Sequence, residues 1–465
     1  MSMLTVEQAL TGNDLAVAAG FADVLQVRVG GREVLYALNQ AEGTLLEFSV
    51  ATNGTLSLVD TLQLSGGFAV GSEPSLTLRL SANGPELMVA GLDPVAGAFI
   101  RLDPTGGLVA QRSDPIPGRL IDPVAFALGR DDGLLNGRSG GIDLYVEGPD
   151  GLVFTDTVSD SASTYLADTR GGTALIGGTS PYLAVASAVD PGVTVLRVDQ
   201  DGEIAVASSF GAAQGLPLST PSALTAFSRE GVAHLVMAAS GSSSLTTLRV
   251  DEAGGLWLTD HVLDTPATRF QSVTSIDAIT VDSASFIAAG GADGGISLFT
   301  MLPNGRLVHL SSVVDTDQTT LYRMSGVTMS ATATALQITV ASQWESGLTR
   351  LSYDLSSFGS VLVLDQGDGR IGTGGDDQII GSDVADRLEG RAGDDILFDG
   401  AESDDLIGGA GADLFVFAAD GVSDRVLDYE HGTDRLDLSA FDFLYDISQL
   451  DVTPTSSGAV LSYRD

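Results

Sequence analysis

Cysteine and lysine are both missing from this chain of 465 residues, and its apolar runs are short. Without cysteine, the chain has no disulfide framework and no thiol chemistry. All 22 basic residues are arginine, and they stand against 61 acidic residues, so the net charge is −39. Such an acidic surface repels nucleic acid and anionic membranes. No apolar run approaches the roughly 18 residues of a membrane-spanning helix. We therefore expect no nucleic-acid partner and no membrane span.

Histidine is also scarce, and the common catalytic signatures are missing. The four histidines are scattered singly and form no H-E-x-x-H zinc motif. We find no phosphate-binding loop, nucleophile elbow or dinucleotide fingerprint either. The opening residues, MSMLTVEQALTGNDLAV, lack the basic start and the continuous apolar stretch of a secretory signal peptide. The sequence therefore assigns no catalytic residue and predicts no cleaved N-terminal signal.

What the chain does contain is a strict nine-residue repeat between Gly372 and Val416. Its five copies read GTGGDDQII, GSDVADRLE, GRAGDDILF, DGAESDDLI and GGAGADLFV. The eighth position is always large and apolar, and the sixth is always aspartate: Asp377, Asp386, Asp395, Asp404 and Asp413. This nonapeptide pattern, G-G-x-G-x-D-x-U-x, predicts a parallel β-roll that binds calcium. A flexible Gly/Asp-rich linker is the alternative, but aspartates in phase with apolar residues argue against it.

Two nonapeptides make one coil of such a roll, so residues 18 positions apart should stack in columns. Calcium takes roughly 6–8 oxygen ligands, which stacked loops can supply from aspartate oxygens and backbone carbonyls. The column of Asp377, Asp395 and Asp413 has glycine at the fourth position of every loop. The column of Asp386 and Asp404 has Val384 and Glu402 there, so we expect its site to be weaker. The predicted metal residues are Gly375, Asp377, Asp386, Gly393, Asp395, Asp404, Gly411 and Asp413.

These residues resemble the repeats-in-toxin family, with its hemolysin-type calcium-binding nonapeptides. The segment that follows, GADLFVFAADGVSDRVLDYEHGTDRLDLSAF, is similar to the C-terminal domain of secreted serralysin-type metalloproteases. The resemblance covers about the last 95 residues. It implies calcium-dependent folding and export by type I secretion machinery, which reads an uncleaved C-terminal signal, and it does not imply protease activity. The chain ends at SSGAVLSYRD, where these proteins often continue to an apolar terminus.

The charge is concentrated in the same region. Residues 365–465 carry a net charge of −18, whereas the other 364 residues carry −21. The C-terminal part is therefore about three times denser in negative charge. Because like charges oppose compaction, this part needs cations to fold, which agrees with calcium binding.

A longer and weaker repeat fills the first 365 residues. A Gly-x-apolar motif recurs with its apolar residue at Leu56, Leu108, Leu152, Ile204, Leu256, Leu307 and Val361. Each unit holds four short runs with period-2 alternation and β-branched residues, which favours strands. A four-stranded unit of about 50 residues is typical of a propeller blade, so seven units predict seven blades. A β-sandwich is the alternative, and the near-constant spacing argues against it. The blades resemble lactonase-like propellers, a likeness to a superfold that does not give function.

The two ends of this region compete for one place. A propeller keeps exposed edges unless the other terminus completes its last blade. We expect MLTVEQAL, residues 3–10, to be the fourth strand of blade seven. The segment FGSVLVLD, residues 358–365, competes for this position or leads into the roll.

Few charged residues are expected near the central channel, which the first strand of each blade should line. The candidates at its mouth are Glu73, Asp122 and Asp277. Their ordinary interpretation is turn and cap chemistry. The alternative is a second cation or a polar ligand held over the channel.

We therefore predict an all-β chain with a seven-bladed β-propeller (1–365), a parallel β-roll of calcium-binding nonapeptide repeats (366–417) and a C-terminal cap with the type I secretion segment (418–465). The predicted function is that of a secreted, extracellular calcium-binding protein. Its propeller would be a binding or scaffold module for an unknown extracellular protein or polysaccharide. The alternative is an extracellular, lactonase-like hydrolase with its site at the channel mouth. The sparse carboxylates there favour a protein that is not an enzyme.

Overall fold

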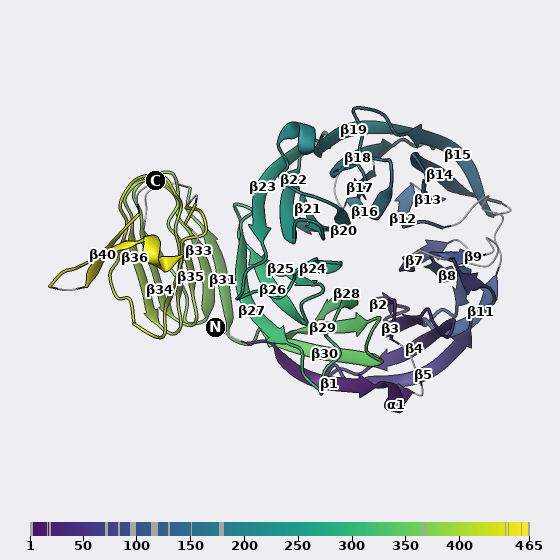
Figure 1. The fold of residues 1–465 in the computed structure, drawn as a ribbon, viewed down its shortest axis with the longest axis horizontal. Coiled ribbons are helices and arrows are strands. Elements are labelled where there is room, and N and C mark those ends of the chain that lie inside the picture. The colour runs from purple at the N-terminus through teal and green to yellow at the C-terminus, as the bar shows by residue number, and fades with distance from the viewer. Residues whose placement is uncertain are drawn as a thin grey trace. The chain divides into compact units, whose positions relative to one another are not determined.

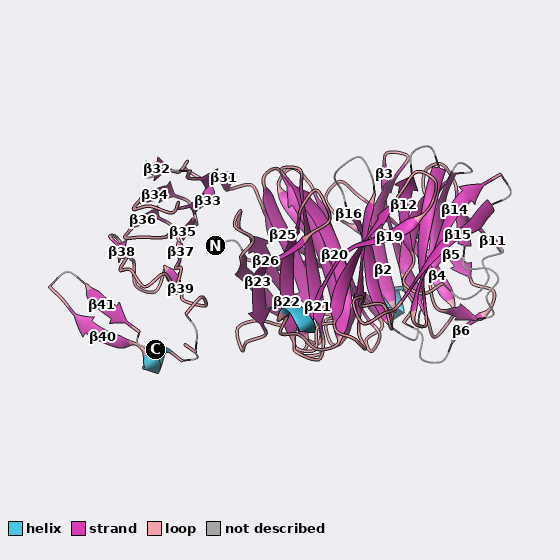
Figure 2. Cartoon of the chain, turned by 90° about the horizontal axis from the view of Figure 1, so that it is seen from above, coloured by secondary structure: helices cyan, strands magenta, loops and turns pink. Residues whose placement is uncertain are grey.

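The chain forms two compact units, Met3–Asp354 and Leu355–Asp465, in the computed structural model (Figure 1). The structure describes residues 3–15, 17, 20–69, 73–81, 84–93, 99–112, 120–128, 131–149, 151–175, 181–365, 369–441, 443–444, 446–456 and 458–463. Both units consist almost entirely of strands (Figure 2). The described helical segments are α1 (Gly12–Leu15), η1 (Ala212–Gln214) and η2 (Ile447–Gln449). Within the described ranges, no helix has the length and apolar character needed to cross a membrane.

The first unit is a propeller of seven four-stranded antiparallel sheets, as the repeat predicted. Blade 1 contains β2 (Asp23–Val29), β3 (Arg32–Asn39), β4 (Thr44–Val50) and β5 (Leu56–Gln63). Blade 2 contains β7 (Leu76–Ser81), β8 (Gly84–Val89), β10 (Phe99–Leu102) and β11 (Leu108–Arg112), with a small added sheet of β6 (Gly67–Phe68) and β9 (Leu92–Asp93). Blade 3 contains β12 (Val124–Leu128), β13 (Asp131–Arg138), β14 (Gly141–Gly148) and β15 (Gly151–Ser159).

The remaining blades repeat the same order of strands. Blade 4 contains β16 (Thr169–Leu175), β17 (Tyr182–Ser187), β18 (Gly192–Val198) and β19 (Ile204–Gly211). Blade 5 contains β20 (Pro221–Arg229), β21 (Val232–Ala239), β22 (Ser244–Val250) and β23 (Leu256–Leu263). Blade 6 contains β24 (Ser275–Val281), β25 (Ala284–Gly290), β26 (Gly295–Met301) and β27 (Leu307–Val314). Blade 7 contains β28 (Met324–Ala331), β29 (Ala335–Ser342), β30 (Gly347–Asp354) and β1 (Thr5–Thr11).

The N-terminal strand closes the ring. Strand β1 pairs antiparallel with β30, from Thr5 opposite Ser352 to Thr11 opposite Gly347. The expectation for MLTVEQAL is thus confirmed. The last Gly-x-apolar motif, ending at Val361, is not a blade turn: it lies in β31 (Phe358–Val363), which pairs in parallel with a strand of the second unit. Because β1 already occupies the edge of β30, the competing segment leads into the roll.

The first strand of each blade lies toward the centre of the ring (Figure 1). Each of these strands, β2, β7, β12, β16, β20, β24 and β28, contacts the next one around the ring. The second and third strands of the blades are the most buried, and every residue of β25 and β26 is buried. Because blades stack face to face, both sides of these strands are covered. Their sequences are therefore nearly continuous apolar runs.

The Gly-x-apolar motif marks the contact between successive blades. Its apolar residue begins the outermost strand in blades 1, 2, 4, 5 and 6 and is the second residue of that strand in blade 3. Its backbone N–H often donates to an acidic or amide side chain of the preceding blade. Ile204 N–H donates to Asp156 at 3.0 Å, and Leu307 N–H donates to Asp260 at 2.7 Å. The motif therefore helps to join successive blades. Because it does so once in each blade, its spacing is regular.

The second unit contains a parallel β-solenoid over residues 358–437. One face is formed by β31, β33 (Asp376–Ile380), β35 (Ile396–Phe398), β37 (Leu414–Val416) and β39 (Arg435–Asp437). The other is formed by β32 (Arg370–Ile371), β34 (Arg387–Ala392), β36 (Asp405–Ala410) and β38 (Arg425–Val426). A hairpin of β40 (Asp451–Pro454) and β41 (Ala459–Ser462) follows. The solenoid thus extends past both ends of the segment 366–417 that the nonapeptides suggested.

Candidate calcium site

The nonapeptides stack with the predicted 18-residue period. Ile379 lies opposite Leu397 and Leu397 opposite Phe415 in one sheet, and Leu388 lies opposite Leu406 in the other. All five side chains are fully buried and form the thin core between the two sheets. This stacking places the sixth-position aspartates in two columns at the turns, as the sequence predicted.

Each column is a ladder of hydrogen bonds between aspartates. Asp377 N–H donates to Asp395 Oδ1 at 2.8 Å, and Asp395 N–H donates to Asp413 Oδ1 at 2.9 Å. In the second column, Asp386 N–H donates to Asp404 Oδ1 at 2.7 Å. Each of these accepting carboxylates therefore uses one oxygen to hold the turn before it, and its other oxygen remains available.

The second oxygen of most repeat aspartates is buried without a partner. Asp395, Asp404 and Asp413 each have a buried Oδ2 with no hydrogen bond, and Asp386 has a buried Oδ1 in the same condition. Asp377 differs, because Ser360 N–H donates to its Oδ1 and Thr373 N–H donates to its Oδ2. A buried charged oxygen without a partner costs several kcal/mol, roughly, unless a cation or a proton compensates it.

Burial also raises the pKa values of several aspartates in these turns. It raises the pKa of Asp395 to about 7, and the nearby charges of Asp413 and Asp377 raise it further. Burial likewise raises the pKa of Asp404 to about 7 and that of Asp413 to about 6. The side chain of Asp399, which replaces the first-position glycine of the fourth repeat, has its pKa raised to about 8 by burial. Carboxylates in this condition favour a bound cation.

Glycine backbone lies directly against the free oxygens. A Cβ atom added at Gly390 would lie 2.1 Å from Asp395 Oδ2 and 2.6 Å from the Gly408 carbonyl oxygen. A Cβ atom at Gly408 would lie 2.1 Å from Asp413 Oδ2. The turns therefore form cradles in which a free carboxylate oxygen and a backbone carbonyl lie close together. Hard oxygen ligands of this kind fit calcium.

The fourth position of the turns requires glycine for two reasons. Gly393 and Gly411 have φ of +117° and +146°, and a Cβ atom at either would lie under 3 Å from the backbone of the turn 18 residues earlier. In the second column Glu402 adopts φ of +68°, a left-handed conformation that is strained for a residue with a Cβ atom. The predicted inequality of the two columns stays a prediction, since both present a buried free oxygen.

Both ladders continue beyond the last nonapeptide, which the sequence analysis missed. Asp413 N–H donates to Asp434 Oδ1 at 3.0 Å, and Asp404 N–H donates to Asp424 Oδ1 at 3.1 Å. Gly408 N–H also donates to Asp428 Oδ1, at 3.0 Å. The signal was present, because Asp-Arg-Val at 424–426 and Asp-Arg-Leu at 434–436 repeat the Asp-x-apolar core of the nonapeptide. Their longer spacing hid them from a search for period nine.

The channel-mouth residues of the propeller lie in a different setting. Asp122 Oδ2 accepts a hydrogen bond from Gly171 N–H, and Asp277 Oδ2 accepts one from Met329 N–H. In both cases the donor belongs to the next blade. Glu73 is exposed and pairs with Arg170 at 2.7 Å. These contacts give Asp122 and Asp277 a role in joining blades.

A third buried aspartate, Asp23, shares this arrangement and was not singled out from the sequence. Its Oδ2 accepts a hydrogen bond from Leu76 N–H at 2.8 Å. Burial raises the pKa of Asp23 to about 7, with smaller contributions from the charges of Asp122 and Asp277. Burial also raises the pKa of Asp122 and of Asp277 to about 6. The only early sign of this role was an aspartate at the start of an innermost strand.

The described residues, those of the aspartate ladders included, contain no group of three or more His, Asp or Glu side chains arranged to hold a metal ion. Neither the described residues nor the comparisons with known proteins support the hydrolase alternative. Most ligands in the ladders would have to be backbone carbonyls, which explains why no cluster of acidic side chains marks these turns.

The fold and the ladders define the class of this protein: a seven-bladed propeller joined to a solenoid of calcium-binding repeats. Residues 371–398 and 380–415 match the family of the RTX, or repeats-in-toxin, calcium-binding nonapeptide repeat. The repeats of this chain are thus RTX repeats, and RTX nonapeptide repeats bind calcium.

The propeller is also similar to solved structures of low sequence identity. No curated protein matches the chain. Among solved structures, a functionally unknown protein from Desulfotomaculum acetoxidans DSM 771 matches 66% of this chain and 90% of its own, with 14% identity and a TM-score of 0.46. A structure described as the Dos1 propeller matches 76% of this chain and 82% of its own, with 13% identity and a TM-score of 0.46.

Proposed function

We propose that this chain is a secreted, extracellular protein whose solenoid folds on calcium and whose propeller is a binding module. The observation that carries the proposal is the set of buried, unpartnered carboxylate oxygens on Asp386, Asp395, Asp404 and Asp413. These oxygens sit in RTX repeats, which are typical of secreted proteins.

Calcium would be held in the cradles between successive turns. In the first column, Asp395 and Asp413 supply the free oxygens, and the turn glycines Gly375, Gly393 and Gly411 bring the backbones of neighbouring turns close together. In the second column, Asp386 and Asp404 supply the free oxygens. Asp377 of the first column supplies none, because both of its carboxylate oxygens already accept hydrogen bonds. A metal that binds only the folded turns adds its binding free energy to folding.

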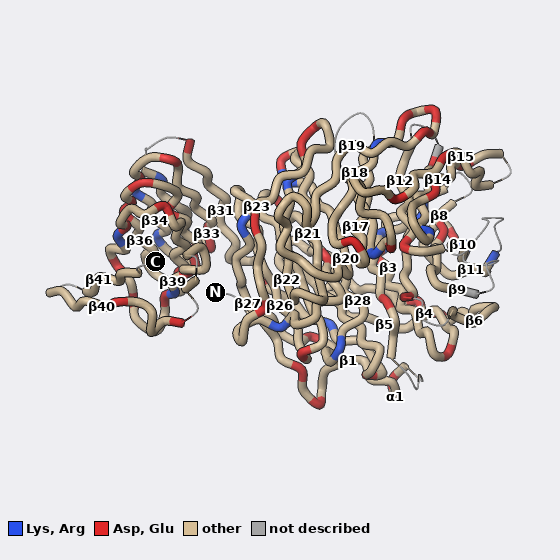
Figure 3. Tube along the Cα trace, turned by 45° about the horizontal axis from the view of Figure 1, so that its top comes forward, with Lys and Arg blue, Asp and Glu red and all other residues tan. Residues whose placement is uncertain are grey.

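The same coupling explains export. Extracellular calcium modules bind with dissociation constants of roughly 10⁻⁴–10⁻³ M. Cytosolic free calcium lies far below this range, so the solenoid would remain unfolded and threadable for type I secretion machinery. Outside the cell, calcium would neutralise the acidic turns that carry much of the red in the solenoid of Figure 3.

The propeller would then act as the part that binds or holds an extracellular partner. Its seven blades are joined by hydrogen bonds from blade to blade and lie outside the RTX repeats. A rigid ring of this kind presents loops from several blades at each end, which is where propellers place binding residues.

A secretion assay with the full chain tests the proposal. The chain is expressed in a bacterial strain with and without a type I exporter, and the medium is analysed with and without millimolar calcium. We expect exporter-dependent release, a gain of β signal in circular dichroism on adding calcium to the chelated protein, and loss of release when residues 418–465 are deleted. Release without the exporter, or identical spectra in calcium and chelator, would contradict it.

A further inference from the structure

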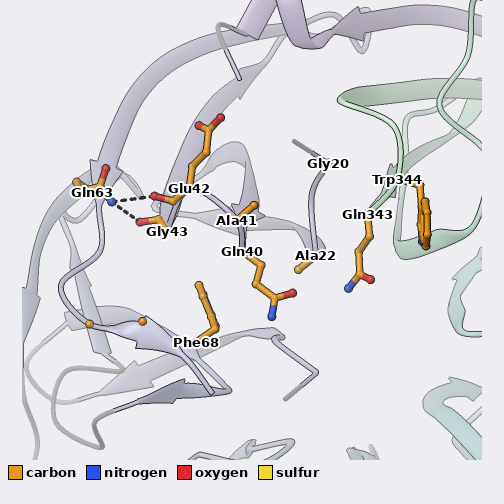
Figure 4. Close-up of a pocket in the computed structure, with 12 residues that line it drawn as sticks. Gly20, Ala22, Gln40, Ala41, Glu42, Gly43, Gln63, Phe68, Gln343 and Trp344 are labelled. Carbon is orange, nitrogen blue, oxygen red and sulfur yellow. Dashed lines mark hydrogen bonds between the residues drawn. The ribbon is translucent and has the colours of Figure 1, made fainter. Parts of the chain in front are cut away.

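The propeller contains a cavity of about 810 Å³ that the sequence analysis did not anticipate (Figure 4). Its walls come from the loops that join strands in blades 7, 1 and 2, so no single segment of the chain defines it. The volume falls within the roughly 300–1,000 Å³ range of ligand pockets. The side chains that matter for its chemistry are Gln40, Phe68, Gln343 and Trp344.

In the view of Figure 4, the two amides lie between the two aromatic side chains. Figure 4 shows Gln40 and Gln343 between Phe68 on one side and Trp344 on the other, with both amide side chains extended in the same direction. No hydrogen bond to either amide group occurs in the described structure, so each offers an acceptor oxygen and two N–H donors. The cavity lining therefore combines apolar surfaces with neutral hydrogen-bonding groups.

Trp344 is held in place and still open to solvent. The guanidinium of Arg323 stacks on its ring, 4.7 Å from the ring centroid. The side chain nevertheless remains 66% exposed. Since a stacked cation covers only one face, the other face is available to a ligand, and the ring keeps its position without one.

Comparison among the blades shows that the shared fold does not require these side chains. In blades 1, 4, 5, 6 and 7, four residues join the second and third strands. The first residue of these loops is Gln40, Ala188, Ser240, Gly291 and Gln343, respectively, and the second is Ala41, Val189, Gly241, Ala292 and Trp344. Among these five loops, the glutamines and the tryptophan occur only in those of blades 1 and 7, which are adjacent and line the cavity together with blade 2. Their clustering indicates a local role beyond that of the repeated fold.

The cavity is also close to neutral. Glu42 is the one charged residue among its lining residues, and Figure 4 shows its carboxylate directed away from Gln40 and Phe68. Gln63 donates to the backbone oxygens of Glu42 and Gly43, at 3.0 Å each, and braces this loop. A net charge of −39 on the chain further disfavours an anionic ligand.

We propose that this cavity binds a neutral saccharide chain. A pyranose ring has an apolar C–H face that packs on an exposed aromatic ring, whose negative face attracts these weakly polarised hydrogens. Its hydroxyl groups donate and accept hydrogen bonds, as the two glutamine amides require. Two aromatic rings separated by two amides suit several consecutive sugar units. The inference rests on the proposed role of the propeller as a binding module and names its ligand class.

Tryptophan fluorescence of the full chain in calcium tests the site directly. The chain has only two tryptophans, so Trp257→Phe leaves Trp344 as the single reporter. The probes are cellohexaose, laminarihexaose, xylohexaose and mannohexaose, with polygalacturonate as the anionic comparison. We expect at least one neutral probe to shift the emission of Trp344, and polygalacturonate to leave it unchanged. No shift with any neutral probe, or a shift with polygalacturonate alone, overturns the proposal.

Calorimetric titration with the neutral probe that binds best then compares the affinities of the wild-type chain and of matched variants. Trp344→Ala and Gln40→Ala should each weaken binding by about tenfold or more, through lost stacking and lost hydrogen bonds. Trp257→Ala is the control, because Trp257 is 56% exposed on β23 and lies outside the cavity. Equal losses in all three variants would overturn the site, and unchanged melting temperatures establish that the variants fold.

Failure of the saccharide site can be told apart from failure of the binding module. The wild-type chain and Trp344→Ala are each incubated with the extracellular polymer fraction of the producing culture. If both sediment equally with that material while no neutral probe binds, the cavity is not the site and the binding module stands. If neither sediments and no probe binds, both proposals fail.

Discussion

Single carboxyl groups determine how the solenoid responds to metal and to pH. Asp395 combines three properties: one oxygen holds the preceding turn, the other is buried and free, and burial raises its pKa to about 7. Because the folded-state pKa lies above the unfolded value, the metal-free turn binds more protons when folded. The contribution of Asp395 to the stability of the metal-free solenoid is therefore fully present below about pH 4 and is lost as pH rises through about 7.

Asp395→Asn should have opposite effects in chelator and in calcium. The amide oxygen can still accept from Asp377 N–H, but the buried charge is removed. Without metal, this relieves an uncompensated carboxylate, so the melting temperature of the solenoid should rise. With calcium, a ligand charge is lost, so the melting temperature should fall and the calcium midpoint should increase by about tenfold. Circular dichroism melts measure both effects.

The control for this variant is Asp383→Asn, because Asp383 is exposed in a neighbouring turn. It should change neither melting temperature appreciably. A shift of the same sign in chelator and in calcium for Asp395→Asn would show that this carboxylate is not a calcium ligand.

At the level of elements, strand β1 decides whether the propeller is a closed ring. It supplies the outer edge of blade 7 and also reaches blade 1 through Gln8. Gln8 Nε2 donates to the Leu56 carbonyl at 3.1 Å, and Leu56 N–H donates to Gln8 Oε1 at 2.8 Å. This pair of hydrogen bonds joins blade 7 to blade 1. It corresponds to the hydrogen bonds that Asp156 and Asp260 accept between other pairs of blades.

Gln8→Ala should therefore weaken the whole propeller. Two hydrogen bonds contribute about 0.5–1.5 kcal/mol each, so the free energy of unfolding should fall by about 1–3 kcal/mol. Urea denaturation in saturating calcium measures the change. Gln318→Ala is the matched control, since Gln318 is exposed in a loop between blades 6 and 7. Equal effects of the two variants would show that Gln8 does not join the blades.

Across the whole molecule, the two compact units differ in how they can be stabilised. The propeller buries apolar strands in every blade, and its inner aspartates accept backbone hydrogen bonds from the next blade. The solenoid has a core only one or two side chains wide and keeps free carboxylate oxygens inside its turns. Packing therefore suffices for the first unit, whereas the second depends on a bound cation.

Scanning calorimetry of the full chain should resolve this difference. Adding chelator to the calcium-loaded protein should abolish or strongly lower the transition of the solenoid and leave the transition of the propeller unchanged. The reason is that buried carboxylate oxygens without hydrogen-bond partners recur in the solenoid, at Asp386, Asp395, Asp404 and Asp413. In the described part of the propeller they occur singly, at Asp293 and at Glu147, which pairs with Arg79. A chelator-induced drop in the propeller transition would contradict this prediction and would indicate a structural cation among Asp23, Asp122 and Asp277.

Local periodicity in the sequence determined much of this protein. The nine-residue period specified the two aspartate columns, because a strict repeat maps directly onto one half-coil of a solenoid. The Gly-x-apolar motif located the outermost strands of six blades, because each blade meets the same turn and the same neighbour. Such features depend on residues close together in the chain, where spacing and residue type suffice.

Only the tertiary structure decided the features that join distant segments. It placed β1 on β30 across more than 300 residues and left β31 to the solenoid, although both segments read as suitable strands. It extended the ladders to Asp424 and Asp434, whose spacing breaks the period, and it brought Asp23 to the channel with Asp122 and Asp277. It also assembled the Gln40 and Trp344 cavity from three blades. Pairing between remote segments depends on which strand edge is left unpaired in the folded ring. The local sequence pattern does not predict this.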